Sequence, residues 1–468
     1  MNIERDSNYE LEQSEKRKKN RKTKSAFYQS VWRWHFYAGL IFAPFLIILA
    51  FSGAVYLFKP QIESFLYNNQ YYVQQADSEA ISANEQLAKV SEAYPDSTVT
   101  SVTYYEEANR TTEFALSDQG VMKTVYVNPY NGEIAGEIET DKKFTEVFKK
   151  LHSELIIGGT VANRIVELAA CWAVILLVTG LYIWWPRNKA SICGTILPRI
   201  TSEGRTFWRD MHAVPAFWLS VFLLILIATG LPWSGVLGEQ INRVATSTNT
   251  GYPDYAQSWA EKPESVVKTK DVAENVPWAA ENLDVPLSVA NGYVPLSLSD
   301  AAFIAENEKI EKPYTITMPQ GDTGVYTIAT SHSTPWDDAT LHVDQYSGAK
   351  LTDVRFADYG LLAKSITVGI ALHEGRLFGF MNQLIGLFVC MGLIGLIVSS
   401  FIMWKKRKSE DRVGAPPKAK DKKVSRTVFV IMLIFGVLMP LVGISIIIVY
   451  ILDRFVIQKF EPLRKWFS

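Results

Sequence analysis

Long apolar runs are the feature that most constrains what this 468-residue chain can fold into. A helix needs roughly 20 apolar residues to cross the hydrocarbon core of a membrane. Five stretches reach that length, so the sequence predicts an α-helical polytopic membrane protein. The predicted spans cover about 34–58, 163–185, 213–235, 381–404 and 428–452.

Clusters of Lys and Arg predict the orientation of these spans, because basic residues are enriched in loops on the cytoplasmic side. One cluster, at 16–24, precedes an apolar run that is too long for a cleavable signal peptide. Two more clusters lie between the second and third spans and between the fourth and fifth. We therefore expect a cytoplasmic N-terminus, two large outward-facing loops, and a C-terminus that ends outside unless the fifth span is re-entrant.

The overall composition excludes several classes of protein. With 47 basic and 48 acidic residues the net charge is −1, which is not the charge of a nucleic-acid-binding protein. The three cysteines form no CxxC pair, so there is no thiol redox motif or covalent haem attachment. The sequence contains no GxGxxG motif and no P-loop, and it therefore supplies no nicotinamide or ATP site. It also contains no nucleophile–base–acid set, and no catalytic residue is assigned.

The two halves of the chain resemble each other. Each large loop holds a helix-like stretch and strand-like runs, and each closes with a strand, a Tyr-Asn-Gly or Tyr-Ser-Gly turn and a second strand. A Trp-Arg segment leading to a histidine opens the first and third spans, at His35 and His212. A Leu-His pair precedes the second and fourth spans, at His152 and His373. The sequence thus predicts an internal duplication, a span, a loop domain and a span repeated twice, followed by a fifth span.

Four of the six histidines occupy these equivalent positions. The predicted orientation places His35 and His212 near the cytoplasmic face, and His152 and His373 on the outer side. Ionisable residues at the edge of a membrane bundle are costly and usually functional. Two imidazoles from different helices are the means by which a helical bundle holds a haem iron from both sides. We therefore predict two haem b groups, bound non-covalently, one to each pair of histidines.

The residues around the inner pair fit this interpretation. Four residues after each inner histidine comes a small residue, Gly39 or Ala216, on the same helix face, which leaves room for a flat macrocycle. Two or three residues before each stands an arginine, Arg33 or Arg209, suited to a haem propionate. Zinc or copper is a weaker alternative because no carboxylate or cysteine lies nearby at ligand spacing. A proton relay or a plain interfacial role also stays open. Of the other two histidines, His342 is predicted to be structural and His332 to be exposed.

These motifs resemble the PepSY-associated transmembrane family, which includes iron-regulated inner-membrane proteins and di-haem ferric-siderophore reductases. The resemblance rests on WRWHFYAGLIFAPFLIILAFSG, LVTGLYIWWPR, FWRDMHAVPAFW, LHEGRLFG and the two YNG/YSG closings, and it covers most of 27–405. It implies two α+β PepSY-like extracytoplasmic domains, the four histidines as haem-iron ligands, and a ferric siderophore as electron acceptor. The basic linker 405–426 and the fifth span depart from the four-span reductases.

The resulting hypothesis is an inner-membrane electron carrier that resembles ferric-siderophore reductases, although the sequence leaves open whether it is an enzyme. Its partners would be the lipid membrane, a quinol or flavoprotein donor, and a ferric siderophore or other oxidised small molecule, with no nucleic acid. The alternative is a non-enzymatic, membrane-anchored PepSY module that binds or inhibits an envelope partner. A transporter is less favoured, because Glu167 is the one clear carboxylate well inside a predicted span.

The expected organisation follows from these boundaries. It comprises a basic cytoplasmic tail (1–26), a first span (27–58), a first PepSY-like domain (59–160), a second span (161–186), a cytoplasmic loop (187–209), a third span (210–235), a second PepSY-like domain (236–378), a fourth span (379–404), a basic cytoplasmic linker (405–427), a fifth span (428–452) and a C-terminal tail (453–468).

Overall fold

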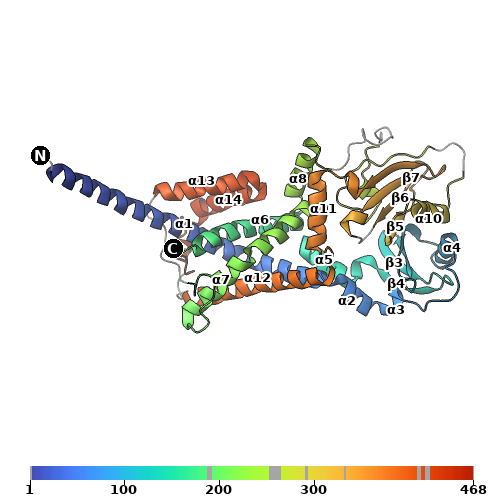
Figure 1. Cartoon of the computed structure of the whole chain (residues 1–468), viewed down its shortest axis with the longest axis horizontal. Coiled ribbons are helices and arrows are strands. Elements are labelled where there is room, and N and C mark those ends of the chain that lie inside the picture. Colours follow the sequence, from blue (N-terminus) through green and yellow to red (C-terminus); the bar gives the residue numbers. More distant parts are fainter. Residues whose placement is uncertain are drawn as a thin grey trace. The chain divides into compact units, whose positions relative to one another are not determined.

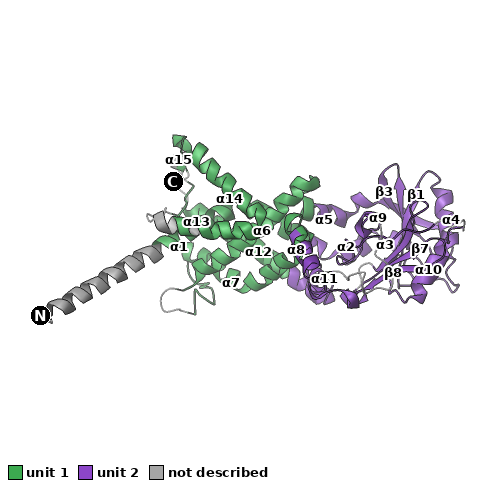
Figure 2. Cartoon of the chain, turned by 90° about the horizontal axis from the view of Figure 1, so that it is seen from above, with its two compact units in different colours: residues 1–54, 151–239, 387–468 green, residues 55–150, 240–386 purple. Residues whose placement is uncertain are grey.

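The computed structural model describes residues 3–186, 192–251, 265–289, 294–330, 334–407, 413–416 and 422–466. Within them, the side chains of 3–25, 422–425, 428, 464 and 465 are outside the description. His332 therefore lies outside the described residues. The chain forms two compact units (Figure 2). Unit 1 comprises 1–54, 151–239 and 387–468, and unit 2 comprises 55–150 and 240–386.

Five helices in the described part of the chain are long and apolar enough to cross a membrane. The prediction of five spans is thereby supported, although the fifth candidate begins at Pro440 and not near 428, and the protein is a multi-pass membrane protein. The candidate spans are Ala26–Tyr56, Gly159–Trp184, Gly204–Trp233, Gly379–Arg407 and Pro440–Ile457. Figure 1 labels helices that carry or adjoin them: α1 (Ile3–Tyr56), α5 (Phe144–Glu154), α6 (Gly159–Trp184), α7 (Gly204–Gly230), α8 (Val236–Ser247), α12 (Gly379–Arg407), α13 (Lys422–Leu438) and α14 (Pro440–Leu452). Helix α15 (Glu461–Trp466) follows near the C-terminus and is labelled in Figure 2.

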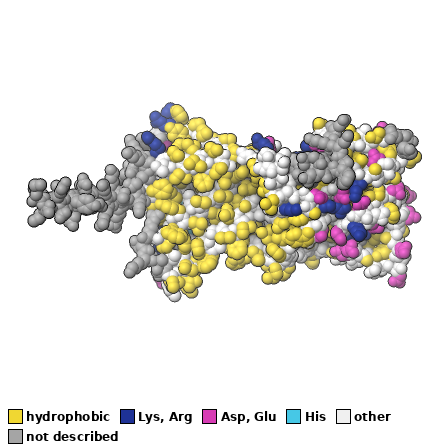
Figure 3. Space-filling view, turned by 45° about the horizontal axis from the view of Figure 1, so that its top comes forward, with side chains coloured by type: hydrophobic (Ala, Val, Ile, Leu, Met, Phe, Trp, Pro, Cys, Tyr) yellow, Lys and Arg dark blue, Asp and Glu magenta, His cyan; other side chains and the backbone are white. Residues whose placement is uncertain are grey.

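Unit 1 has an apolar interior and an apolar exterior. One interior cluster joins Phe42 and Leu46 of α1 to Trp172 and Ile175 of α6, and a second joins α7 to α12. Figure 3 shows hydrophobic side chains spread over the visible face of these helices. Apolar surface as extensive as this is unusual on a soluble protein but is what hydrocarbon chains cover.

The predicted single helix over 428–452 is wrong, because the structure divides the fifth apolar run into α13 and α14 at Met439. Pro440 begins α14, where its missing N–H is tolerated, but it cannot continue α13. The two helices meet at glycines, since a Cβ on Gly443 would lie 2.8 Å from the carbonyl oxygen of Gly436. The run therefore forms a helical hairpin, and α14 docks on α6 through a 3.0 Å hydrogen bond from Trp172 Nε1 to Ser445 Oγ.

The C-terminal segment returns to the linker that follows α12. The backbone N–H of Val413 donates to the carbonyl oxygen of Trp466 in α15 at 3.0 Å. The carbonyl of Val413 accepts from Trp404 Nε1 at 2.7 Å. These bonds place the end of the chain beside the basic end of α12, and not at the opposite end of unit 1 as a single crossing would require.

Unit 2 contains one eight-stranded antiparallel sheet in the order β4-β3-β2-β1-β5-β6-β7-β8. The first four strands come from the first large loop and the last four from the second. Strands β1 and β5 pair directly, with Val102 opposite Ile316, so the two predicted loop domains share a single sheet. The strands are β1 (Thr98–Tyr104), β2 (Thr112–Asp118), β3 (Val121–Val127), β4 (Ile134–Glu139), β5 (Tyr314–Thr317), β6 (Val325–Thr330), β7 (Ala339–Asp344) and β8 (Lys350–Arg355).

The two halves of the sheet share the same local structural features. One helix precedes each set of strands, α4 (Ala83–Ala93) or α10 (Leu298–Asn307), and each begins with a capping box, from Ser82 or Ser297. The two helix starts bind each other, because Asn84 and Ser299 exchange backbone-to-side-chain hydrogen bonds of 3.1 Å. Together with the inner face of the sheet they enclose the main core of unit 2.

The two predicted turn hairpins are confirmed. Gly132 and Gly348 both have a φ of 72°, the left-handed conformation that glycine adopts without strain. The side chains of Asn128 and Asp344 accept hydrogen bonds from the backbone N–H two residues further on. The remaining α-helices of unit 2 are α2 (Lys59–Leu66), α3 (Asn68–Tyr71), α9 (Thr269–Val272) and α11 (Leu361–His373).

Candidate functional site

His35 on α1 is held by a hydroxyl group of the neighbouring span. Its Nδ1 lies 2.9 Å from Oγ1 of Thr179 on α6. That hydroxyl already donates its proton to the carbonyl oxygen of Ile175 at 2.6 Å. It can therefore only accept from the imidazole, and Nδ1 must carry the proton. The lone pair of His35 then lies on Nε2.

His152 on α5 has the same arrangement with α1. Its Nδ1 lies 3.1 Å from Ser52 Oγ and 3.0 Å from the carbonyl oxygen of Leu49. Ser52 donates its own proton to the carbonyl of Ile48 at 2.6 Å. Both neighbours of Nδ1 are therefore acceptors, which favours a proton on this nitrogen.

His212 on α7 completes the pattern. Its Nδ1 lies 2.9 Å from the carbonyl oxygen of Leu396 on α12, and a carbonyl can only accept. His35, His152 and His212 thus each have Nδ1 beside an oxygen that can accept its proton, which favours the tautomer with the proton on Nδ1. This is the tautomer that metal-binding histidines commonly show, with the second nitrogen oriented by a carbonyl or hydroxyl.

Glycines lie against two of these imidazoles. A Cβ on Gly180 would lie 3.1 Å from Cε1 of His35, and one on Gly53 would lie 3.1 Å from Cε1 of His152. Each glycine directly follows the hydroxyl residue that binds the same ring. The sequence reasoning missed these residues, although a signal existed: Ser52-Gly53, Thr179-Gly180 and Thr229-Gly230 recur in the first three spans.

The two inner histidines, His35 and His212, both belong to unit 1, and their pairing stays a prediction. The outer pair is different. His152 belongs to unit 1, whereas His373 is the last residue of α11 in unit 2. The predicted pairing of these two histidines therefore stays a prediction.

The predicted neighbours of the inner pair are engaged within unit 1. A Cβ on Gly39 would meet Leu176 at 3.9 Å, and Ala216 packs against the cluster that joins α7 to α12. Arg33 donates to the carbonyl oxygen of Pro416 at 2.6 Å. Arg209 donates to the buried carboxylate of Asp210 at 3.0 and 2.7 Å. The proposed role of both arginines toward propionates also stays a prediction.

Glu167, the carboxylate inside the second span, has a structural partner. Its two oxygens accept from the backbone N–H groups of Val236 and Leu237 at 2.9 and 2.8 Å, at the start of α8. Negative charge at a helix N-terminus satisfies unpaired N–H groups and complements the helix dipole. This buried carboxylate is therefore accounted for without a transported ion.

Among the residues that the structure describes, no three His, Cys, Asp or Glu side chains are grouped to hold a metal ion. Pairs of imidazoles are thus the ligand sets to consider in unit 1. Five candidate spans and a separate eight-stranded sheet define the class: a multi-pass membrane protein with a β domain.

The chain belongs to the PepSY-associated TM region family, whose model matches residues 32–407. This match confirms the family resemblance of the sequence motifs. It includes all four candidate histidines and excludes the α13–α14 hairpin. A comparison with curated proteins found no match.

Proposed function

We propose that this protein carries electrons across a bacterial inner membrane through two non-covalent haem b groups, and that it reduces an extracytoplasmic acceptor, most simply a ferric siderophore. The observation that carries the proposal is that Nδ1 of His35, His152 and His212 in each case lies beside an acceptor oxygen, the arrangement that orients histidine ligands. Haem iron held between two imidazoles supplies reversible one-electron chemistry and has no open coordination position.

The spacing along α1 supports two separate sites. Seventeen residues separate His35 from Ser52, the partner of His152. At 1.5 Å per residue this is a rise of about 26 Å, close to the roughly 30 Å hydrocarbon thickness. Between these levels Phe42 of α1 stacks on Trp172 of α6, with ring centroids 5.4 Å apart. Residues of unit 1 thus hold the imidazoles of His35 and His152, and this aromatic pair lies between the two levels.

The matched capping boxes, turns and strand order of the two halves support an internal duplication of PepSY-like modules. In the proposal these modules lie outside the inner membrane and approach the oxidised small molecule. The electron donor is a quinol or a flavoprotein, because the sequence carries no nicotinamide motif of its own.

The first test is the haem content of the full chain purified from haem-replete cells. We expect a red protein with two haem b per chain in a pyridine haemochrome assay. A colourless preparation that is folded by circular dichroism and gel filtration would contradict the proposal. It would favour the alternative, a membrane-anchored PepSY module that binds or inhibits an envelope partner.

The second test concerns the end of the chain. Lys405, Lys406 and Arg407 end α12, and basic residues favour the cytoplasm. Because Trp466 is bonded to the linker beyond α12, we propose that the C-terminus is cytoplasmic and that the α13–α14 hairpin is re-entrant. A C-terminal green fluorescent protein fusion should fluoresce and an alkaline phosphatase fusion should be inactive. Active phosphatase with a dark fluorescent-protein fusion would reverse this topology.

A further inference from the structure

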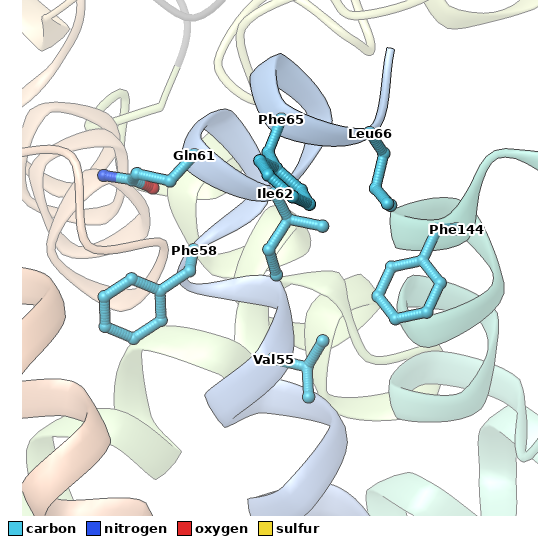
Figure 4. A pocket seen from close by; sticks show the side chains of 7 residues that line it. All are labelled: Val55, Phe58, Gln61, Ile62, Phe65, Leu66 and Phe144. Carbon is cyan, nitrogen blue, oxygen red and sulfur yellow. The ribbon is translucent and has the colours of Figure 1, made fainter. Parts of the chain in front are cut away.

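A groove opens on unit 2 at the point where α1 ends, with a volume of about 580 Å³ (Figure 4). Its walls come from the last residues of α1, from α2 and from the start of α5. Six of its seven lining side chains are apolar: Val55, Phe58, Ile62, Phe65, Leu66 and Phe144.

The seventh lining residue, Gln61, has both ends of its side-chain amide engaged by Gln383. Its amide nitrogen donates to Gln383 at 2.8 Å, and its amide oxygen accepts from Gln383 at 3.4 Å. Both ends of the amide are therefore already bonded. The groove thus has the chemistry of a hydrocarbon site and lacks the convergent polar groups that a quinone ring or a sugar would require.

Several of the lining side chains are strongly exposed in the free chain. Phe65 is 83% exposed, Leu66 48% and Phe144 41%. Transfer of such a side chain from water to an apolar environment is favourable by about 1.5–3 kcal/mol. An apolar occupant or environment would therefore stabilise this surface.

The position of the groove in the chain indicates what covers it. Val55 lines the groove and also belongs to the candidate span Ala26–Tyr56, so the groove is continuous with a surface that faces lipid. Helix α2 begins only three residues after that span ends, and it alternates polar residues with Ile62, Phe65 and Leu66. A short amphipathic helix that follows a span is typical of segments lying in the membrane interface.

The charged residue at the start of α2 fits the same position. Lys59 pairs with Glu146 at 3.2 Å, and its ammonium lies 5.7 Å from the ring centroid of Tyr56. Lysines and tyrosines at the ends of spans anchor them at the level of the lipid head groups. The groove therefore begins at the level of the lipid head groups, and its lining side chains are apolar.

We propose that α2 lies in the membrane interface and that its groove holds one acyl chain of a membrane phospholipid. Three features indicate an acyl chain as the occupant: the apolar lining, the continuity with the span through Val55, and the exposed aromatic side chains of the walls. This assignment does not depend on haem, so it stands or fails separately from the proposed electron transfer.

The test uses a bimane fluorophore on Phe65→Cys in the full chain, in a background carrying Cys193→Ser and Cys390→Ser. The protein is reconstituted in nanodiscs of phosphatidylcholine and phosphatidylglycerol, with or without lipids carrying a nitroxide at acyl carbon 5. We expect the acyl nitroxide to reduce the emission at least twofold and aqueous iodide to have little effect. The matched control is Val121→Cys on β3, which is 45% exposed and should respond to iodide only.

A second labelled variant, Phe144→Cys, reports from the opposite wall and should give the same acyl quenching. Gel filtration and the Val121→Cys control verify that the labelled chains are folded. Iodide quenching at Phe65→Cys equal to that at Val121→Cys would overturn the proposal. Loss of the acyl quenching after addition of one equivalent of decylubiquinone would also overturn it, since the occupant would then be a quinone.

Discussion

Replacement of His212 with alanine is expected to remove one of the two haems and leave the other in place. His212 and His35 come from α7 and α1, two helices of unit 1, and are the proposed ligands of one haem. Bis-imidazole ligation needs both rings, so either His35→Ala or His212→Ala should release the same group. The pyridine haemochrome assay should fall from two haems to one per chain in both variants.

Double variants make this prediction sharper. His35→Ala combined with His212→Ala should still retain one haem, because both changes act on one site and their effects are not additive. His212→Ala combined with His152→Ala should retain none. The control for non-specific loss is His342→Gln, which changes a buried histidine of the sheet in unit 2 and should keep both haems. Retention of two haems by His212→Ala would contradict the proposed pairing of His35 with His212. Loss of both haems by the His35→Ala and His212→Ala double variant would also contradict it.

The sequence predicts the elements whose signals are local. Runs of about 20 apolar residues locate the spans, and the Tyr-Asn-Gly and Tyr-Ser-Gly turns locate the final hairpin of each loop. The pairing of β1 with β5 is not local, since more than 200 residues separate Val102 from Ile316. The residue pattern of neither strand indicates which strand it pairs with. The break at Met439 was hidden because the apolar run continues through it, although Pro440 is the residue that makes it.

At the candidate site, the sequence identified the histidines but not the groups that orient them. Ser52 and Thr179 are common residues in membrane helices, and their significance appears only when the protons are assigned. The position of Arg209 three residues before His212 predicts a propionate partner, and that prediction stays open. In the structure the guanidinium of Arg209 binds the adjacent Asp210, a contact that the sequence analysis did not predict.

The sheet of unit 2 is expected to lose stability on acidification because of one buried histidine. His342 on β7 is fully buried, its Nδ1 lies 2.6 Å from Thr352 Oγ1, and the prediction that it is structural is thereby confirmed. Burial lowers the pKa of His342 from 6.5 to about 4. The folded state therefore holds the neutral ring, whereas the unfolded chain takes up a proton near pH 6.5.

The sign of the effect follows from this difference in proton uptake. Above pH 6.5 neither state is protonated at this ring, and its contribution to stability is complete. Between pH 6.5 and about 4 the unfolded state binds more protons, so the free energy of unfolding falls as the pH falls, by a total of about 3 kcal/mol. Hydrogen exchange of the full chain in nanodiscs should show faster exchange of the β6–β8 amides at pH 4.5 than at pH 7 after correction for intrinsic rates.

His342→Gln separates this titration from other effects of acid, because an amide can still bond to Thr352 but does not titrate in this range. The variant is expected to be less stable at pH 7 through its altered packing, yet to lose about 2 kcal/mol less than the parent between pH 7 and 4.5. The comparison is a difference of differences, so a constant packing cost cancels. An equal acid-induced loss in both proteins would assign the pH dependence to carboxylates elsewhere in unit 2 and not to His342.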